Sequence, residues 1–123
     1  MILLDTNIFI EIYRGNVNIT SIVDNMHGVA VCDVVRAELF YGARNKRELQ
    51  EISVDLDGLT VLSLLPKISE MAVDLVKTYC LSHKLEFADA LIAATAILHN
   101  AELFTLNRKD FAYIPNLKLY EPQ

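Results

Sequence analysis

The chain opens with MILLDTN, residues 1–7, a short apolar run that ends on an acid. Ile2, Leu3 and Leu4 are not interrupted by polar residues, which is the pattern of a strand buried on both faces in a parallel sheet. Asp5 then stands at the carboxyl end of that strand. Ligands of open α/β sheets bind at this edge, because the loops that leave the strands surround a crevice there.

The rest of the chain repeats this alternation of apolar strands and helices. Further strands are predicted over 29–32, 60–65, 102–106 and 117–120. Periodicity and helix-ending residues predict helices over 7–13, 17–26, 33–41, 45–56, 69–83 and 86–99. Asn7 and Asp33 are expected to cap the helices that follow the first two strands. Strands that alternate with helices, often in pairs, indicate an α/β fold, a three-layer α/β/α sandwich with a mainly parallel central sheet.

Length and composition indicate one domain, residues 1–123, with a sizeable core. Hydrophobic residues make up 53% of the chain, more than a buried sheet needs, which favours a partner interface. Ala90–Leu98 is apolar all round and is expected to be a buried helix, since it falls short of the ~20 residues that span a membrane. No basic residue precedes Asp5, so the sequence predicts no signal peptide and a cytoplasmic protein. Cys32 and Cys80 are expected to be unpaired, buried thiols.

The charge balance limits how the protein could handle nucleic acid. The formal net charge is −5, which excludes a surface that grips phosphates mainly by bulk positive charge. A phosphate-bearing substrate would therefore need metal ions or local basic residues. Arg44 and Arg108 are candidates for the rim of such a site, where they would contact RNA phosphates.

Several acids are predicted to meet at the carboxyl edge of the sheet. The residues expected at this edge follow the strands: Asp5, Asp33 with Glu38 just beyond it, and Asn107 with Asp110. Asp89 joins them if it opens the apolar helix, where it could also serve as a simple cap. Gathered carboxylates raise one another's pKa unless a cation neutralises them. A set without histidine or thiolate ligands suits Mg²⁺ or Mn²⁺, and such ions activate water for phosphodiester hydrolysis.

Glu38 lies in an apolar helix, where a buried unpaired carboxylate would be costly unless it bound a cation or paired with Arg36 or Arg44. The three histidines each fall near a predicted helix end without a partner at ligand spacing. They are therefore interpreted as helix-end residues rather than catalytic ones.

Four segments carry a family resemblance: LDTN at 4–7, AELFYGAR at 37–44, ADALIAATA at 88–96 and FTLNRKDF at 104–111. They resemble, in order and at typical spacing, the four motifs of the PIN-domain family, and most closely those of its VapC-type toxin ribonucleases from type II toxin–antitoxin systems. The resemblance implies an α/β/α sandwich and a Mg²⁺- or Mn²⁺-dependent endoribonuclease. It also implies a homodimer and a cognate antitoxin protein as partner.

The same resemblance assigns roles to individual residues. Asp5, Glu38 and Asp89 match the three metal-binding acids of the family. Thr6 matches the hydroxyl beside the first acid and Thr105 the one before the fourth position. Asn7 is interpreted from its position alone, as a helix cap first and as a support for the acids second. The fourth position, often aspartate in the family, is Asn107 here, and Asp110 follows three residues later. Either residue could serve there, so the number of metal ions stays open.

Two other functions fit parts of the pattern. An aspartyl-phosphate phosphatase also places an aspartate after its first strand as a nucleophile, but Asn7 stands where such enzymes have a second aspartate. A non-catalytic PIN-like binding module would use the acids only to receive a basic partner.

Overall fold

A computed structural model describes all residues from Met1 to Gln123. Its five strands form one sheet, in which all neighbouring strands run parallel in the order β3-β2-β1-β4-β5. The strands are β1 (Ile2–Leu4), β2 (Val29–Cys32), β3 (Thr60–Leu62), β4 (Glu102–Phe104) and β5 (Lys118–Leu119). The predicted α/β class and parallel sheet are therefore confirmed.

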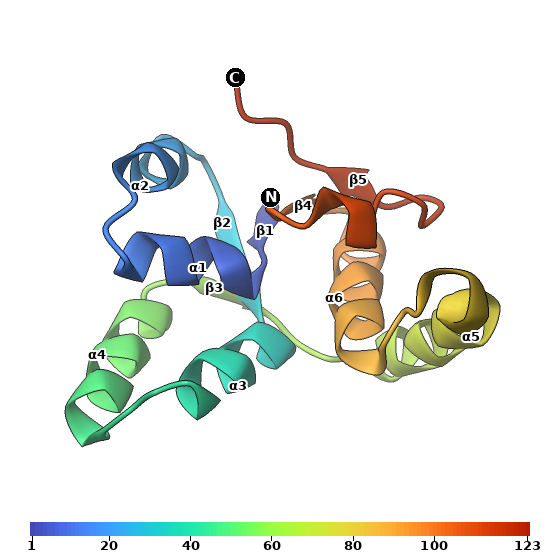
Figure 1. The fold of residues 1–123 in the computed structure, drawn as a ribbon, viewed down its shortest axis with the longest axis horizontal. Helices are drawn as coiled ribbons and strands as arrows, with labels where there is room; N and C mark the ends of the chain where they lie inside the picture. The colour runs from blue at the N-terminus through green and yellow to red at the C-terminus, as the bar shows by residue number, and fades with distance from the viewer.

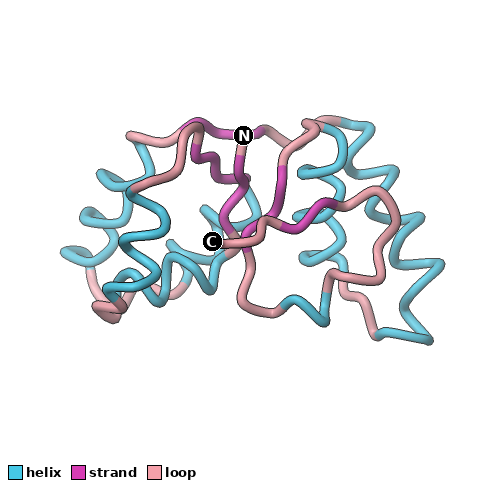
Figure 2. Tube along the Cα trace, turned by 90° about the horizontal axis from the view of Figure 1, so that it is seen from above, coloured by secondary structure: helices cyan, strands magenta, loops and turns pink.

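Six α-helices and one 3₁₀ helix, η1, connect the strands. The helices are α1 (Thr6–Tyr13), α2 (Val17–Asp24), α3 (Asp33–Tyr41), α4 (Lys46–Asp57), α5 (Pro66–His83), α6 (Phe87–Leu98) and η1 (Arg108–Asp110). The ribbon in Figure 1 places α1 to α4 on one side of the molecule and α5 with α6 on the other. Seen from above in Figure 2, the strands lie between these two groups of helices.

The sheet order explains why the helices fall into two groups. The crossovers from β1 to β2 and from β2 to β3 step in one direction along the sheet, whereas the crossover from β3 to β4 returns past β1. Because parallel crossovers are right-handed, the two directions put their helices on opposite faces. The chain therefore leaves β1 and β4 toward opposite faces. The carboxyl ends of these two strands are the switch point of the sheet, the place where open α/β folds form a ligand crevice.

The core lies on both faces of β1. Leu3 and Leu4 are almost completely buried, and Leu4 is aligned with Phe104 of β4. Helix α6 is buried nearly all round, as its apolar run predicted, and it packs on α5, α3 and β4. No helix of the molecule combines the length and the apolar character that crossing a membrane requires.

Element boundaries differ from the prediction where polar or cyclic residues intervene. The third strand ends at Leu62 rather than at residue 65, and α5 begins at Pro66 rather than at Ser69. Proline suits the first helical position, because its missing N–H would have no partner there. Strand β4 also ends early, so Thr105 follows the strand. Of the two free cysteines, Cys32 is buried as expected, but Cys80 is exposed on α5.

The two predicted helix caps near the crevice are wrong. Asp5, not Asn7, caps α1, since its side chain accepts the N–H of Thr6. Asp33 is the first residue of α3 rather than its cap, and it pairs with Arg36 at 3.0 Å. In both cases the strand runs directly into the helix, which shifts the cap by one or two residues.

Candidate active site

Asp5 is the most enclosed acid of the molecule, with only 6% of its surface exposed. One carboxylate oxygen accepts the N–H of Thr6 at 2.8 Å, and the other accepts the hydroxyl of Thr105 at 2.8 Å and the amide of Asn7 at 3.4 Å. Burial raises the pKa of Asp5 above its ordinary value, and the hydrogen bonds from Thr105 and Thr6 oppose the rise. Donors on both oxygens hold the carboxylate in one orientation.

Thr105 links the ends of β1 and β4. Its hydroxyl oxygen accepts the backbone N–H of Asn107 at 3.0 Å and the amide of Asn7 at 3.3 Å. A hydroxyl has one hydrogen and two acceptor positions, so with both acceptor positions used its hydrogen is directed to Asp5. The oxygen of Asn7 in turn accepts the N–H of Leu106. Asn7 therefore connects the ends of the two strands through hydrogen bonds and does not cap a helix.

Glu38 reaches the same region from α3, but not as a buried charge. The residue is exposed, and its carboxylate accepts the hydroxyl of Thr6 at 2.8 Å. Neither Arg36 nor Arg44 pairs with it, because these arginines bind Asp33 and Glu48. The expectation that Glu38 is buried is therefore wrong, since its side of α3 faces the open crevice. The contact with Thr6 connects Glu38 to the residue that follows Asp5.

Asp89 lies in the first turn of α6 and is partly buried. The pKa of Asp89 is raised to about 6, mainly by burial and in addition by the negative charges of its neighbours Asp5, Asp110, Glu38 and Glu86. No side chain donates a hydrogen bond to its carboxylate. The four neighbours come from four different parts of the chain, which means that the acids share one electrostatic environment.

The two candidates for the fourth position differ in what they contribute. The side chain of Asn107 is exposed and makes no hydrogen bond, whereas its backbone N–H binds Thr105. Asp110, on η1, adds negative charge that raises the pKa of both Asp5 and Asp89. Asp110 is therefore one of the negative charges that act on Asp5 and Asp89.

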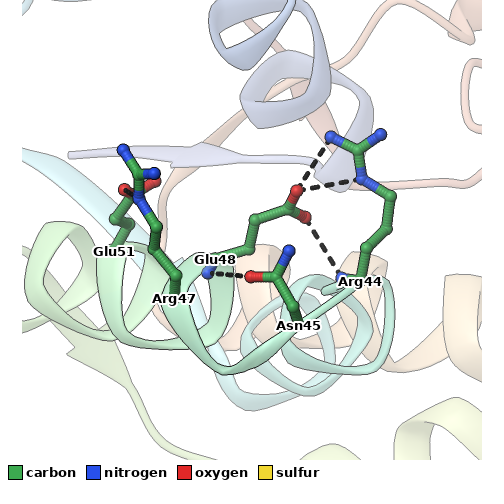
Figure 3. Close-up of polar contacts among 5 residues, drawn as sticks. All are labelled: Arg44, Asn45, Arg47, Glu48 and Glu51. Atoms are coloured by element: carbon green, nitrogen blue, oxygen red, sulfur yellow. Dashed lines mark hydrogen bonds and ion pairs between the residues drawn. The ribbon is translucent and has the colours of Figure 1, made fainter.

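The two predicted rim arginines are both engaged elsewhere. Arg108 donates to the carbonyl of Tyr120 and pairs with Glu121 in the carboxyl-terminal tail. Arg44 pairs with Glu48 at the start of α4, where Asn45 accepts the N–H of Glu48 (Figure 3). Arg44 also lines a hollow with Tyr13 that contains none of the four crevice acids.

The donor set of the crevice matches a hard cation in its chemistry. It consists of carboxylates, hydroxyls and an amide, without histidine or thiolate. The mutual repulsion felt by Asp89 is the kind that a bound cation removes. As the side chains stand, no three acidic, histidine or cysteine groups are close enough together to hold one ion. A change in the position of at least one acidic side chain would therefore be needed to bring three ligands onto one ion.

A hollow beside the acids was not predicted from the sequence. It is lined by residues 83–86 together with Asp89, Asp110 and Tyr113. The rings of His83 and Tyr113 stack there with centroids 3.8 Å apart. Tyr113 lies in an irregular turn, where no periodicity marks its position, and nothing in the sequence indicates that it would meet a helix-end histidine.

Comparisons with known proteins agree with this fold. The model of the PIN domain matches residues 2–117, which is nearly the whole chain. The protein therefore belongs to the PIN-domain family, as its four motifs predicted.

Within that family the chain is similar to proteins named VapC. It is 31% identical over 123 residues to ribonuclease VapC19 of Mycobacterium tuberculosis, covering 96% of this chain and 98% of that protein. Among solved structures, a toxin–antitoxin complex from Klebsiella pneumoniae has a chain with 31% identity and a TM-score of 0.84, over 100% of this chain and 98% of that one. VapBC2 from Rickettsia felis, bound to a promoter DNA fragment, gives 30% identity and a TM-score of 0.77, over 98% of each chain.

Proposed function

We propose that this protein is a metal-dependent endoribonuclease and the toxin of a toxin–antitoxin pair. The observation that carries the proposal is that Asp5 and Glu38 lie near enough to Asp89 for their charges to act on it, so that burial and this repulsion together raise the pKa of Asp89 to about 6. Carboxylates that repel one another at a strand-end crevice favour a cation and its phosphate ligand. The ribonuclease names of its relatives support the same reaction.

Asp5, Glu38 and Asp89 would hold Mg²⁺ or Mn²⁺, with Asp110 or Asn107 in the fourth position. A bound ion of this kind lowers the pKa of a coordinated water and stabilises the charge that develops on the phosphate. Asp5 is the fixed ligand, because donors already orient both of its oxygens. Glu38 is the adjustable one, since it is exposed and restrained by a single hydrogen bond from Thr6.

The surrounding residues keep the ligands in position. Thr105 and Asn7 hold Asp5 from the side of β4, and Thr6 holds Glu38. Such supporting contacts commonly change metal affinity or activity by about 10- to 100-fold when they are lost.

RNA phosphates would be received at the rim near η1. Arg108 adjoins Asn107, and its pairing with Glu121 is at the surface, with both side chains well exposed. Exposed ion pairs contribute only about 0–1 kcal/mol, so Arg108 can exchange Glu121 for a phosphate at little cost. Arg44 is the weaker rim candidate, because it lines the separate hollow near Tyr13.

A cognate antitoxin and a homodimer complete the proposal. Solved structures similar to this chain are described as toxin–antitoxin and VapBC complexes. Exposed apolar side chains, among them Tyr41 and Leu81 at 94% exposure, offer surface for such partners. Light scattering of the purified protein, alone and after co-expression with a neighbouring small open reading frame, tests both expectations. A strictly monomeric protein that retains no co-expressed product would contradict them.

The decisive test of the enzyme is a matched pair of aspartate substitutions. We expect Asp5→Asn to lower RNA cleavage in Mg²⁺ at least about a hundredfold, because loss of a residue that merely supports a metal ligand already costs about 10- to 100-fold. Asp33→Asn is the control, because Asp33 also follows a strand directly but pairs with Arg36 instead of joining the crevice acids. Wild-type cleavage by the Asp5→Asn protein would refute the proposal.

The two alternatives have their own readouts. A beryllium fluoride adduct on Asp5 would favour a phosphatase, although a residue with only 6% of its surface exposed is poorly placed to attack a substrate. Absence of Mn²⁺ binding in calorimetry, with no change in Glu38→Gln, would favour a non-catalytic module.

A further inference from the structure

The hollow beside the crevice acids is enclosed on several sides by different elements. Its volume is about 430 Å³, within the range of sites that bind small organic groups. The end of α5, the start of α6, η1 and the turn after η1 each contribute to its lining. Two of the lining residues, Asp89 and Asp110, also belong to the acidic crevice. A group in this hollow would therefore lie next to the crevice.

A stacked aromatic pair lies in the wall of the hollow. The rings of His83 and Tyr113 are nearly parallel, at 14°, with centroids 3.8 Å apart. Tyr79, one turn before His83 on α5, makes T-shaped contacts with both rings. Its ring centroid lies 5.0 Å from that of Tyr113 and 5.7 Å from that of His83. The hydroxyl of Ser82 also lies 2.8 Å from Nδ1 of His83. These contacts hold both rings in place, although His83 itself is exposed.

The polar groups around the rings are of two kinds. Lys84 ends α5 in a left-handed conformation, with φ of 55°, and contributes the one positive charge of the lining. Glu86 caps α6 without any hydrogen bond from its side chain, and its carboxylate can only accept. The hollow thus combines an aromatic face, a cation and carboxylate acceptors.

We propose that this hollow binds a nucleobase of the RNA strand next to the cleaved phosphate, extending the stack of His83 and Tyr113. The inference rests on the proposed ribonuclease function and adds a determinant of its sequence preference. Aromatic rings recognise unpaired RNA bases by stacking, and polar groups read the base edge. Carboxylate acceptors at that edge favour bases that present amino hydrogens, which uracil lacks, and Lys84 is suited to an adjacent phosphate.

A binding experiment tests stacking independently of cleavage. Short RNAs that carry 2-aminopurine at one position each are mixed with wild-type protein in Ca²⁺, and fluorescence quenching is followed. We expect quenching at one position, and in His83→Ala and Tyr113→Ala about a five- to hundredfold weaker affinity, the range for loss of base stacking. Tyr113→Phe keeps the ring and should bind as wild type. Equal quenching by wild type and both alanine variants would overturn the inference, whether or not the protein cleaves RNA.

A cleavage experiment then tests sequence preference. A pool of random RNAs is cut in Mg²⁺ and the ends are sequenced, with circular dichroism to verify that each variant folds. His83→Ala, at an exposed position, should lose discrimination against uracil at one nucleotide beside the cut and raise KM while kcat changes little. Tyr13→Ala, at another partly exposed tyrosine outside the hollow, is the control. An unchanged preference in His83→Ala, together with lost binding of a co-expressed antitoxin, would assign the hollow to the protein partner instead and overturn the inference.

Discussion

The hydroxyl of Thr105 donates a 2.8 Å hydrogen bond to the buried carboxylate of Asp5, although the two residues are 100 positions apart in the chain. The contact exists because β4 pairs directly with β1 and both strands end at the crevice. The same hydroxyl accepts the N–H of Asn107, so it orders the loop after β4 as well. One side chain thereby connects the most buried acid to the residues of the fourth motif.

Substitution of Thr105 by valine should damage both stability and activity. Valine keeps the shape but removes the donor to Asp5 and the acceptor for Asn107, which leaves a buried carboxylate oxygen short of a partner. We expect the free energy of unfolding to fall by about 1–3 kcal/mol in urea titration. RNA cleavage should fall by about 10- to 100-fold. Thr105→Ser, which keeps the hydroxyl, is the control, and equal stability of the two variants would contradict the role of the hydrogen bond.

The raised pKa of Asp89 predicts how stability depends on pH without metal. Its pKa is about 6 in the folded protein against an ordinary value of 3.8, so the folded state holds the proton more tightly between these values. The free energy of unfolding should therefore decrease as pH rises from about 4 to about 6 and stay lowered above that. In EDTA at pH 8, Asp89→Asn should be more stable than wild type by on the order of 1 kcal/mol, because partial exposure screens the repulsion.

The same pair of proteins at pH 4 should have equal stability, since Asp89 is then mostly protonated. Adding Mn²⁺ at pH 8 should stabilise wild type more than Asp89→Asn. The cation would bind only the folded protein, where it neutralises the carboxylates that otherwise repel one another, and the variant has lost one of these ligands. An Asp89→Asn protein that is no more stable than wild type in EDTA would show that the neighbouring acids do not destabilise the ionised Asp89.

The start of α4 offers a stability change that should leave the crevice intact. Asn45 accepts the N–H of Glu48 at 2.9 Å, and the Glu48 carboxylate returns to the N–H of Arg44 at 3.1 Å (Figure 3). Asn45→Ala should lower the free energy of unfolding by about 1 kcal/mol through loss of this cap. RNA cleavage at 25 °C should stay at the wild-type rate. If the cleavage rate falls together with the free energy of unfolding, α4 supports the crevice more directly than we expect. Asn45→Asp, which keeps an acceptor, is the matched control.

The sequence predicted the order of elements well because strand and helix signals are local. Ile2–Leu4 reads as a buried strand from its own residues, and the apolar run of α6 reads as a buried helix. The position of the crevice could also be predicted, because parallel strands bring their carboxyl ends to one edge of the sheet. The family motifs then singled out Glu38 and Asp89, among the acids expected at that edge, as partners of Asp5 in a metal site.

What the sequence could not predict depends on contacts between distant segments. Asn7 looks like a cap because it follows a strand, but its amide is taken by Thr105, which stands nearly a hundred residues away. Glu38 looks buried among apolar neighbours on α3, yet the side of the helix that it occupies faces the crevice. Tyr113 meets His83 only because the turn after η1 folds onto the end of α5. Local patterns carry no information about such meetings.

The fourth position of the metal site can be assigned by comparing two substitutions. Asp110 raises the pKa of Asp5 and Asp89 through its charge, whereas the side chain of Asn107 makes no hydrogen bond. Asp110→Asn should therefore lower the pKa of Asp89 below about 6 in NMR titration without metal, and weaken Mn²⁺ binding about tenfold or more. Asn107→Ala should leave both quantities close to wild type. If calorimetry instead shows a larger loss of Mn²⁺ affinity in Asn107→Ala than in Asp110→Asn, the fourth ligand is Asn107, and Asp110 contributes only its charge.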